Sequence, residues 1–391
     1  MPTRETAVAL CAVGAEKIVS NEIRKLGLSV SEGGFGRVRF KADLEGLYRA
    51  LVGLRAADRV LLETSWFEAA DFDALFEGIR DIPWEDYIPR DFGVRVAKVR
   101  TNRSRLEAET SIQAVVHKAA ADRLCAKWRV NRLPENGGTA ELRIYIEKDR
   151  VSALLDLSGE PLFKRGYRTR GGVAPLRETT AAAVMLHSGW RRKFPLYDPF
   201  CGAGTIAIEA AMYAWDIAPG LTRQFALDKL LLGDPNIKRE VREEFQDRVD
   251  FSRLVRIGGS DADAGAIAAA RANMERAIAC EGRDAIAAPA YPVTFRVLPM
   301  EEARPAEQGE AGEPCGFIIT NPPYGRRLGD TESSEKTYAE MGKLAGNFPG
   351  WKLAVITDHA GFESFFGRKA DSCREITNGA INSYIYLYEK L

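Results

Sequence analysis

Two short stretches combine residue types that could hold a ligand and carry chemistry. The first, Tyr197 to Thr205 (YDPFCGAGT), predicts a buried strand that turns through glycines into a helix over residues 206–213. A glycine turn lets the backbone approach a ligand closely, and the start of a helix offers free N–H groups. The second, Thr320 to Arg327 (TNPPYGRR), follows a short apolar run and ends it with two prolines. Together the two stretches predict a nucleotide-like cofactor beside a flat substrate.

The glycine turn differs from two common nucleotide-binding fingerprints. Gly202 and Gly204 form G-x-G without a third glycine, and the next acidic strand end, Asp261, lies 57 residues beyond Gly204 rather than about 20. No Gly-Lys-Ser/Thr follows, so the turn is not a P-loop either. Asp261 offers a carboxylate that could accept two ribose hydroxyls. Asp263 is its rival for that role, and a helix N-cap is the plainer interpretation of Asp263.

The Asn-Pro-Pro-Tyr turn indicates chemistry on an amine. A proline restricts the residue before it to extended geometry, so Asn321 and Pro322 are both constrained. The Asn321 side-chain oxygen and the Pro322 carbonyl would be two acceptors for an exocyclic amine, whose lone pair then turns out of its ring plane. Tyr324 could stack on that ring, an interaction worth about 1–3 kcal/mol per base. No titrating base is required, because the amine loses its proton after it attacks a positively charged electrophile.

The elements that must position these turns alternate between strand and helix. Such alternation after about residue 166 predicts a parallel sheet covered on both faces. A helix is expected before the strand that ends at Asp198, and further strands are expected at 293–298, 317–319 and 352–357. Residues 215–250 are expected to form a polar, loop-rich interruption. The terminal INSYIYLYEKL alternates like a final antiparallel edge strand.

Two smaller units precede this sheet. Residues 1–65 have the spacing of a βαββαβ unit, with Asp43 able to cap its second helix. Residues 66–165 add helices over 71–79 and 112–128, a strand over 94–99 and a hairpin around Lys148–Arg150. We therefore expect an α/β protein of three domains, at 1–65, 66–165 and 166–391, of which the first two are α+β.

Composition restricts the class of protein. The hydrophobic fraction of 46% and the charged fraction of 28% are typical of a folded soluble protein. We expect no membrane span, no signal peptide and a cytoplasmic location, because no apolar run approaches about 20 residues and no basic leader precedes the first one. Six cysteines without C-x-x-C and three scattered histidines argue against a disulfide framework or a metal centre.

The net charge is zero, but two segments are strongly basic. Arg90 to Arg132 holds 11 Lys/Arg against 4 Asp/Glu, and Pro161 to Lys193 holds 8 against 1. Such segments could form a phosphate-binding face, and ordinary solvated helices and loops are the alternative.

DPFCGAGT and NPPYG, with APLRET before them, resemble class I S-adenosylmethionine-dependent methyltransferases that modify exocyclic amines. The whole chain is similar to the bacterial THUMP-domain RNA methyltransferases, specifically the 23S rRNA guanine-N2 group. LFKRGYR at Leu162–Arg168 and APGLTRQFALDK at Ala218–Lys229 match that group as well. The resemblance implies a Rossmann-like domain over 166–391, a ferredoxin-like segment over 1–65 and a THUMP RNA-binding domain over 66–165.

The resemblance also implies roles for individual residues. Asn321, Pro322 and Tyr324 would bind the target base. S-adenosylmethionine would be held by a larger set, in which Met300 and Glu301 flank the adenine and Leu176 and Thr179 close the pocket: Leu176, Thr179, Asp198, Phe200, Gly202, Gly204, Thr205, Asp261, Met300 and Glu301. RNA phosphates would be gripped by Arg100, Arg103, Arg105, Lys164, Arg165 and Arg168. Cys201 lies inside the motif and is expected to pack rather than react.

Two other functions stay open from the sequence. A DNA adenine-N6 methyltransferase is one, because the same turn could grip any planar amine. A non-catalytic RNA-binding factor in ribosome assembly is the other. The intact set of Asp198, Gly202, Gly204, Asn321 and Tyr324 argues against that second alternative, because a silent site has no need to keep these residues together.

Overall fold

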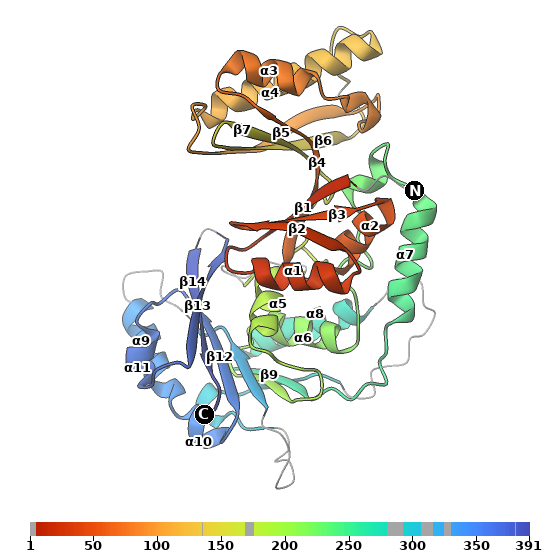
Figure 1. The fold of residues 1–391 in the computed structure, drawn as a ribbon. Helices are drawn as coiled ribbons and strands as arrows, with labels where there is room; N and C mark the ends of the chain where they lie inside the picture. Colours follow the sequence, from red (N-terminus) through yellow and green to blue (C-terminus); the bar gives the residue numbers. More distant parts are fainter. Residues whose placement is uncertain are drawn as a thin grey trace.

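The computed structural model describes residues 5–134, 136–168, 176–279, 292–305, 316–323, 330–379 and 381–391. Within these residues the chain forms two seven-stranded sheets, one from the N-terminal half and one from the C-terminal half (Figure 1). Helices of the first half pack directly onto the second, as α1 does on α5.

The first sheet has the strand order β2-β3-β1-β4-β7-β6-β5. Its first part is the expected βαββαβ unit: β1 (Glu5–Cys11), α1 (Glu16–Lys25), β2 (Ser29–Gly34), β3 (Arg37–Ala42), α2 (Leu44–Gly53) and β4 (Ala57–Glu68). Asp43 caps α2 as predicted, since its side chain accepts a hydrogen bond from the Gly46 N–H. Val19 and Ile23 of α1 and Leu47 and Leu51 of α2 are buried in the core.

The second part continues the same sheet. It consists of α3 (Phe72–Arg80), the short 3₁₀ helix η1 (Trp84–Asp86), β5 (Gly93–Asn102), α4 (Glu109–Trp128), β6 (Thr139–Glu147) and β7 (Arg150–Asp156). The long strand β4 pairs with β1 on one side and with β7 on the other. The expected boundary between residues 65 and 66 therefore falls inside β4, and the two N-terminal units share one sheet.

The second sheet has the order β10-β9-β8-β11-β12-β14-β13. Its strands are β8 (Leu196–Asp198), β9 (Ile257–Asp261), β10 (Thr294–Val297), β11 (Phe317–Thr320), β12 (Lys352–Thr357), β13 (Ser372–Asn378) and β14 (Ile381–Tyr388). The strands from β10 to β12 pair in parallel, and β14 pairs antiparallel with β12. The terminal strand is antiparallel as predicted, but its expected edge position is wrong. It lies between β12 and β13 because the preceding strand β13 takes the edge.

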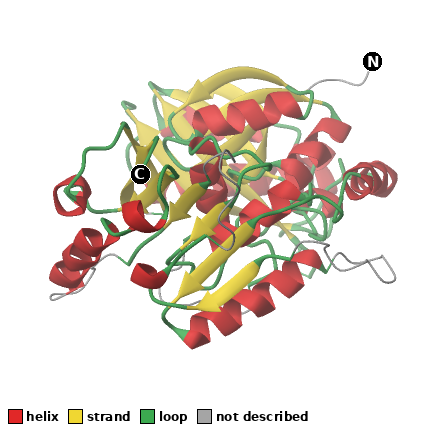
Figure 2. Cartoon of the chain, turned by 90° about the horizontal axis from the view of Figure 1, so that it is seen from below, coloured by secondary structure: helices red, strands yellow, loops and turns green. Residues whose placement is uncertain are grey.

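Helices cover both faces of this second sheet (Figures 1 and 2). One face packs against α5 (Glu178–His187), α6 (Thr205–Ala214) and α8 (Ala264–Ile278). The other packs against α9 (Asp330–Met341), α10 (Leu344–Asn347) and α11 (Phe362–Phe366). The neighbours Ile318 and Ile319 of β11 point into these two separate cores. This two-sided burial explains why the central strands β11 (FIIT) and β12 (KLAVIT) are nearly continuous apolar runs.

The interruption at 215–250 is more ordered than its polar sequence suggests. It contains the helix α7 (Pro235–Asp247), which the loop-rich prediction missed. Asp234 caps this helix, and its buried face presents Val241 and Phe245. α7 lies beside α2, where Arg49 forms an ion pair with Glu244 (Figure 1). An amphipathic helix whose apolar stripe is narrow depends on such a partner for its stability.

The strand order reverses next to β8. The chain runs from β8 outward to β9 and β10, then returns to place β11 on the other side of β8. In open parallel sheets, ligands bind outside the carboxyl ends of the strands at such a switch point. The glycine turn follows β8 and the Asn-Pro-Pro turn follows β11, so both lie at this position.

Candidate functional site

A cavity of about 1050 Å³ lies at the switch point. Residues from the ends of β8, β9 and β11 line it together with residues of α8. Most of the predicted site is gathered here, namely Leu176, Asp198, Phe200, Gly202, Thr205, Asp261, Met300, Glu301 and Asn321. Sequence positions separated by more than a hundred residues thus share one crevice.

The glycine turn has a backbone that only glycine adopts readily. Gly202 has φ +51° and Gly204 has φ +84°. A side chain at Gly202 would meet no heavy atom within 4 Å, whereas one at Gly204 would press on Ala270 and Phe295 at 3.1 Å. Gly202 therefore keeps the cavity wall open, and Gly204 lets α6 pack closely against the elements behind it.

Asp261 connects β9 to the glycine turn. Its Oδ2 accepts a hydrogen bond from the Gly202 N–H at 3.0 Å, and its Oδ1 accepts one from the Asp263 N–H at 3.0 Å. Asp263 lines the cavity too, but its side chain accepts from the Gly265 N–H and caps α8. Asp263 therefore caps α8, whereas Asp261 connects the end of β9 to the glycine turn.

Asp198 is a buried carboxylate with two hydrogen-bond donors. Its Oδ1 accepts from the Thr320 hydroxyl at 2.6 Å and from the Phe200 N–H at 3.1 Å. Burial raises the pKa of Asp198 to about 7, and the nearby charge of Asp261 adds to the rise, while the two hydrogen bonds lower the pKa. A cation in the cavity would favour the charged form of Asp198.

Asn321 presents an unused acceptor. Among the described residues, its Oδ1 is buried and has no hydrogen-bond partner. Such an atom costs free energy unless a ligand satisfies it. Pro322 is buried and does not line the cavity, whereas Pro323 does. Tyr324, the third predicted base-binding residue, lies outside the described residues.

Four other predicted cofactor residues have different surroundings. Met300 is 5% exposed in the 3₁₀ helix η3 (Met300–Glu302), and Glu301 beside it is exposed. Leu176 lines the cavity from the segment before α5. Thr179 does not line the cavity, because its hydroxyl donates to Asp58 of β4 at 2.5 Å. The structure thus places Thr179 at the contact between the two halves of the chain.

The predicted RNA-binding residues separate into two groups. Arg100, Arg103 and Arg105 are exposed, and so is the side chain of Lys164. Arg165 is only 2% exposed and contacts Glu209 at 3.5 Å, so its assignment to an RNA surface is wrong. A guanidinium enclosed by Glu209 and the carbonyls of Leu162 and Arg55 cannot reach a phosphate.

Arg168 also differs from its predicted place. It lines the cavity, where it donates to the Thr205 hydroxyl at 2.5 Å and to the Leu176 carbonyl at 3.3 Å. Its side chain is 12% exposed and lies 3.7 Å from Glu178. The basic segment around residue 165 therefore joins the two halves of the chain and reaches the cavity.

Sequence reasoning missed two residues of α8 that support the site. Asn273 donates to the Ala203 carbonyl at 2.9 Å, inside the glycine turn. Arg276 donates to Asn273 at 2.6 Å and to the Tyr167 carbonyl at 2.6 Å. The only signal was their polarity on an alanine-rich helix, where Asn273 is nevertheless 3% exposed. Thr320, which holds Asp198, was noted only as the start of the motif.

We expect Asn273→Ala to lower the free energy of unfolding by about 1–3 kcal/mol, because the Ala203 carbonyl and Arg276 each lose a buried partner. Chemical denaturation monitored by circular dichroism measures this change. Asn236→Ala, at an exposed position in the first turn of α7, is the control and should change stability by no more than about 0.5 kcal/mol. Equal stability of the two variants would exclude the bracing role of Asn273.

Cys201 packs as predicted. It is 6% exposed, and burial raises the pKa of its thiol far above the ordinary value. A thiol with a raised pKa is a poor nucleophile. Within the described residues, no three His, Cys, Asp or Glu side chains gather as a metal site would require. None of the described helices is long and apolar enough to cross a membrane.

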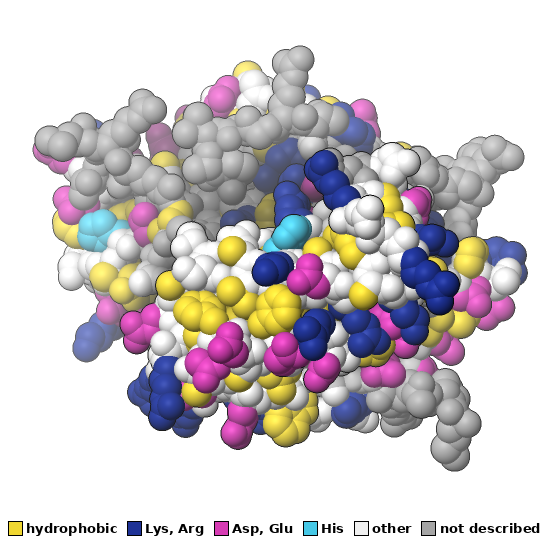
Figure 3. Space-filling model, turned by 90° about the horizontal axis from the view of Figure 1, so that it is seen from above, with side chains coloured by type: hydrophobic (Ala, Val, Ile, Leu, Met, Phe, Trp, Pro, Cys, Tyr) yellow, Lys and Arg dark blue, Asp and Glu magenta, His cyan; other side chains and the backbone are white. Residues whose placement is uncertain are grey.

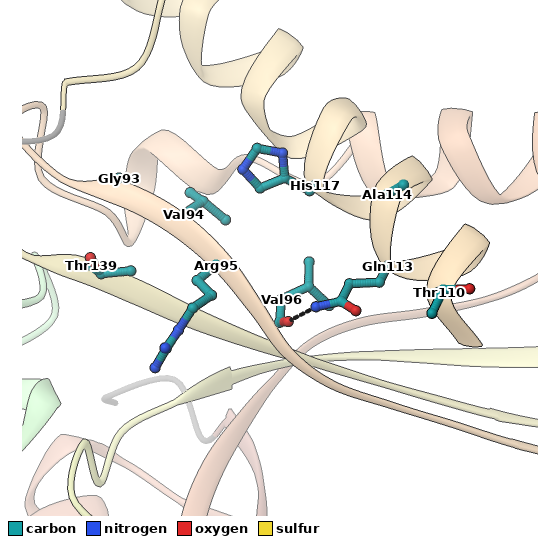
Figure 4. Close-up of a pocket in the computed structure, with 9 residues that line it drawn as sticks. All are labelled: Gly93, Val94, Arg95, Val96, Thr110, Gln113, Ala114, His117 and Thr139. Carbon is teal, nitrogen blue, oxygen red and sulfur yellow. Dashed lines mark hydrogen bonds between the residues drawn. The ribbon is translucent and has the colours of Figure 1, made fainter.

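A second hollow, of about 690 Å³, lies between β5 and α4 (Figure 4). Gln113 of α4 reaches across it and donates to the Val96 carbonyl at 2.7 Å. Arg95 and His117 are the ionisable residues in its lining, which contains no carboxylate. The lining of this second hollow therefore lacks carboxylates such as Asp198 and Asp261 of the larger cavity.

Comparison with known proteins places the chain in a family. The profile of the RMKL-like methyltransferase domain matches residues 165–386, and that of the RlmL ferredoxin-like domain matches residues 6–61. YpsC of Bacillus subtilis, described as a candidate RNA methyltransferase, is 32% identical over 98% of this chain and 95% of its own length. The ribosomal RNA large subunit methyltransferase K/L of Syntrophotalea carbinolica is 34% identical over 94% of this chain. The chain spans about half of that relative, 51% of its length.

Two solved structures are similar to this chain over nearly its full length. SMU.472, described as a candidate methyltransferase and crystallised with SAH, has a TM-score of 0.86 and 34% identity, with 100% of this chain and 99% of that chain covered. A Listeria monocytogenes protein described as a predicted N6-adenine-specific DNA methylase has a TM-score of 0.86 and 36% identity, covering 99% of this chain and 96% of its own. The methyltransferase profile alone covers more than half of the chain, and it matches the part that contains the cavity. The chain therefore belongs to the RMKL-like methyltransferase family, with an RlmL-type ferredoxin-like domain at its N-terminus.

Proposed function

We propose that this protein transfers a methyl group from S-adenosylmethionine to the exocyclic N2 amine of a guanosine in RNA, with 23S ribosomal RNA as the substrate class. The observation that carries the proposal is the cavity in which the buried Asp198, the Asp261 carboxylate and the unpaired Asn321 oxygen lie together. Relatives named as ribosomal RNA large subunit methyltransferases support the choice of RNA.

The residues present fit such a cofactor. Asp198, with its pKa raised by burial, would face the positively charged methionine part beside the open turn at Gly202. Asp261 would accept the ribose hydroxyls, and Met300 would pack on the adenine. The SAH bound to SMU.472 supports the choice of cofactor. When bound, the cofactor supplies an electrophilic methyl group on a sulfonium.

The chain's own residues would then orient the amine. The Asn321 Oδ1 is constrained by the following proline and accepts one amine hydrogen. This contact holds the amine at a set position and orientation, which is the main contribution that positioning makes to a transfer reaction. No ionisable side chain has to remove a proton before the transfer.

The N-terminal half would hold the RNA. A guanine amine inside a helix cannot enter the cavity, so the target base must be unpaired or turned out of its stack. Arg100, Arg103, Arg105 and Lys164 are exposed and would contact phosphates. Residues 66–165, which we expect to be a THUMP domain, contain all four of these residues.

The test is nucleoside analysis of RNA treated with the full chain. Large-subunit ribosomal RNA from a strain lacking the gene is incubated with protein and S-adenosylmethionine, and its nucleosides are separated by mass spectrometry. We expect N2-methylguanosine to appear in 23S RNA only. Methylation of adenine in a parallel DNA reaction, with none in RNA, would instead support the activity named for the Listeria protein.

A further inference from the structure

Three segments of the N-terminal sheet meet at one rim, which we call the Trp66 rim. It comprises the end of β4 (Trp66 to Ala69), the loop after β5 (Asn102 to Leu106) and the β6–β7 turn (Lys148 to Arg150). The rim belongs to the part of the sheet that carries α3 and α4, away from the second sheet (Figure 1). The mechanism proposed above uses none of the side chains of its β4 and β6–β7 segments.

Asp149 holds the three segments together. Its Oδ1 accepts from the Ser104 hydroxyl at 2.9 Å and from the Arg105 N–H at 2.7 Å. Its carbonyl accepts from the Ala69 N–H at 2.8 Å, and the Lys148 N–H donates to the Asn102 carbonyl at 3.1 Å. The hydrogen bonds from the Arg105 N–H and the Ser104 hydroxyl lower the pKa of Asp149, so its carboxylate is already engaged within the rim.

The backbone of the rim has positive φ at three residues. Arg103 has φ +50°, Lys148 has φ +53° and Asp149 has φ +62°. Five non-glycine residues of the described chain have positive φ, and three of them lie here. Lys148 and Asp149 are the two loop residues of the β6–β7 hairpin, and a tight two-residue turn requires positive φ at both positions. Arg103 lies outside that turn, and Lys148 and Arg103 are both exposed.

An exposed tryptophan lies on the same rim. Trp66 is 56% exposed, although an indole is a large apolar surface to leave in water. The Arg150 guanidinium lies 3.9 Å from the centre of its ring, a cation–π contact that orients the indole. Trp66 pairs across the strands with Ser152, a small neighbour that leaves the indole uncovered.

Five basic and four acidic side chains lie around the indole. Arg100, Arg103, Arg105, Lys148 and Arg150 are exposed on or beside the rim. The acidic side chains nearby are Glu68, Glu107, Glu147 and Asp149. Glu147 forms an ion pair with Arg37 at 2.6 Å, and Asp149 accepts the hydrogen bonds that connect the three segments. The end of the molecule seen in Figure 3 intermixes Lys and Arg with Asp and Glu, so basic charge alone does not distinguish one surface. The exposed indole distinguishes the rim.

We infer that the Trp66 rim binds unpaired RNA, with one base stacked on Trp66 and the flanking phosphates held by the surrounding cations. Sequence-tolerant recognition of single strands combines these two components, an aromatic face for the base and a positive groove for the backbone. This inference rests on the proposed function, because it assigns the RNA substrate a second contact outside the cavity. The contact would retain an unpaired segment next to the target base.

The test uses the full chain and two labelled probes, the single-stranded oligonucleotide r(A)12 and heparin, in fluorescence anisotropy titrations. Heparin carries the negative charge without bases. We expect Trp66→Ala to weaken r(A)12 binding about tenfold and to leave heparin binding unchanged. Trp66→Phe keeps an aromatic face and should restore most of the affinity, whereas Trp66→Leu should not. Arg103→Glu should weaken binding of both probes.

Wild-type affinity of Trp66→Ala for r(A)12 would overturn the inference, and so would equal recovery by Trp66→Leu and Trp66→Phe. An equal loss of affinity for both probes in Trp66→Ala would overturn it as well, because heparin has no bases that could stack on Trp66. The thermal shift produced by SAH serves as the folding control and should be the same in all variants. If the wild-type protein forms N2-methylguanosine but Trp66→Ala binds r(A)12 with unaltered affinity, the proposed function stands. Only the RNA-binding role of the Trp66 rim is then rejected.

Discussion

Replacing Asn321 by alanine is expected to lower the rate of methyl transfer about 10²–10³-fold, the usual cost of removing one fixed hydrogen-bonding group from a reacting centre. The physical reason is that Asn321 carries a buried acceptor without a partner among the described residues, at the end of β11 beside Asp198. In the proposed mechanism, that acceptor positions the amine for the transfer. Single-turnover transfer to 23S RNA with saturating cofactor measures the rate.

Binding should distinguish this variant from a misfolded one. The affinities of Asn321→Ala for SAH and for RNA are expected to stay within about twofold of wild type, because only the contact to the amine is removed. Asn321→Asp keeps an oxygen at the same place and should retain part of the activity, whereas Asn236→Ala should retain all of it. An Asn321→Ala enzyme that turns over at the wild-type rate would refute the base-gripping role.

Asp198→Asn is expected to weaken cofactor binding and, at the same time, to stabilise the ligand-free protein at pH 8. Burial raises the pKa of Asp198 to about 7, above the value near 3.9 of an unfolded aspartate. The folded state therefore binds this proton more tightly than the unfolded state. The contribution of this bound proton to the stability of the folded state is complete below about pH 4, and it is lost as the pH rises through about 7.

The cost of ionising Asp198 in the ligand-free protein is at most about 4 kcal/mol, from a pKa difference of about 3. Asparagine resembles the protonated aspartic acid and avoids this cost, since its oxygen can still accept from Thr320 and Phe200. Urea denaturation at several pH values should show Asp198→Asn more stable than wild type at pH 8, with the difference vanishing near pH 4. Asp234→Asn, the same exchange at the N-cap of α7, should show no such trend.

Cofactor binding should change in the opposite direction. Removing one member of a buried charge pair costs 2–5 kcal/mol, so the dissociation constant of S-adenosylmethionine should rise about 30-fold or more at pH 8. Wild-type affinity should strengthen as the pH increases from 6 to 8, because the carboxylate becomes charged, and the variant should lack that dependence. Calorimetric titrations that give the same affinity for both proteins at pH 8 would rule out Asp198 as the counter-charge.

Much of the site could be predicted from local sequence. Gly202 and Gly204 predicted a turn between a strand and a helix, and the two prolines after Asn321 predicted the end of a short apolar strand. Asp198 and Asp261 close apolar strands of a parallel sheet, so their carboxylates had to lie at one edge. Such features depend on chain geometry within a few residues, which the sequence states directly.

Partners distant in sequence could not be predicted in this way. Basic residues near position 165 indicated an RNA surface, but Arg165 is buried against Glu209 and Arg168 lines the cavity. The sequence does not distinguish an arginine that is exposed to water from one that is buried against a carboxylate. Only the packing of the folded chain decides which of the two it is. Thr179 illustrates the same point, because its hydroxyl is taken by Asp58 from the other half of the chain.

By itself the sequence determined the family, the α/β class and the two turns that form the cavity, because glycine, proline and strand-ending aspartates constrain the backbone wherever they occur. The tertiary structure decided that β13 takes the edge position expected of β14, that α7 orders the insertion, and that Asn273 braces the glycine turn. It also placed the exposed Trp66 on the same rim as three non-glycine residues with positive φ. These outcomes depend on which surfaces remain to be buried once the strands have paired, and that competition involves the whole chain at once.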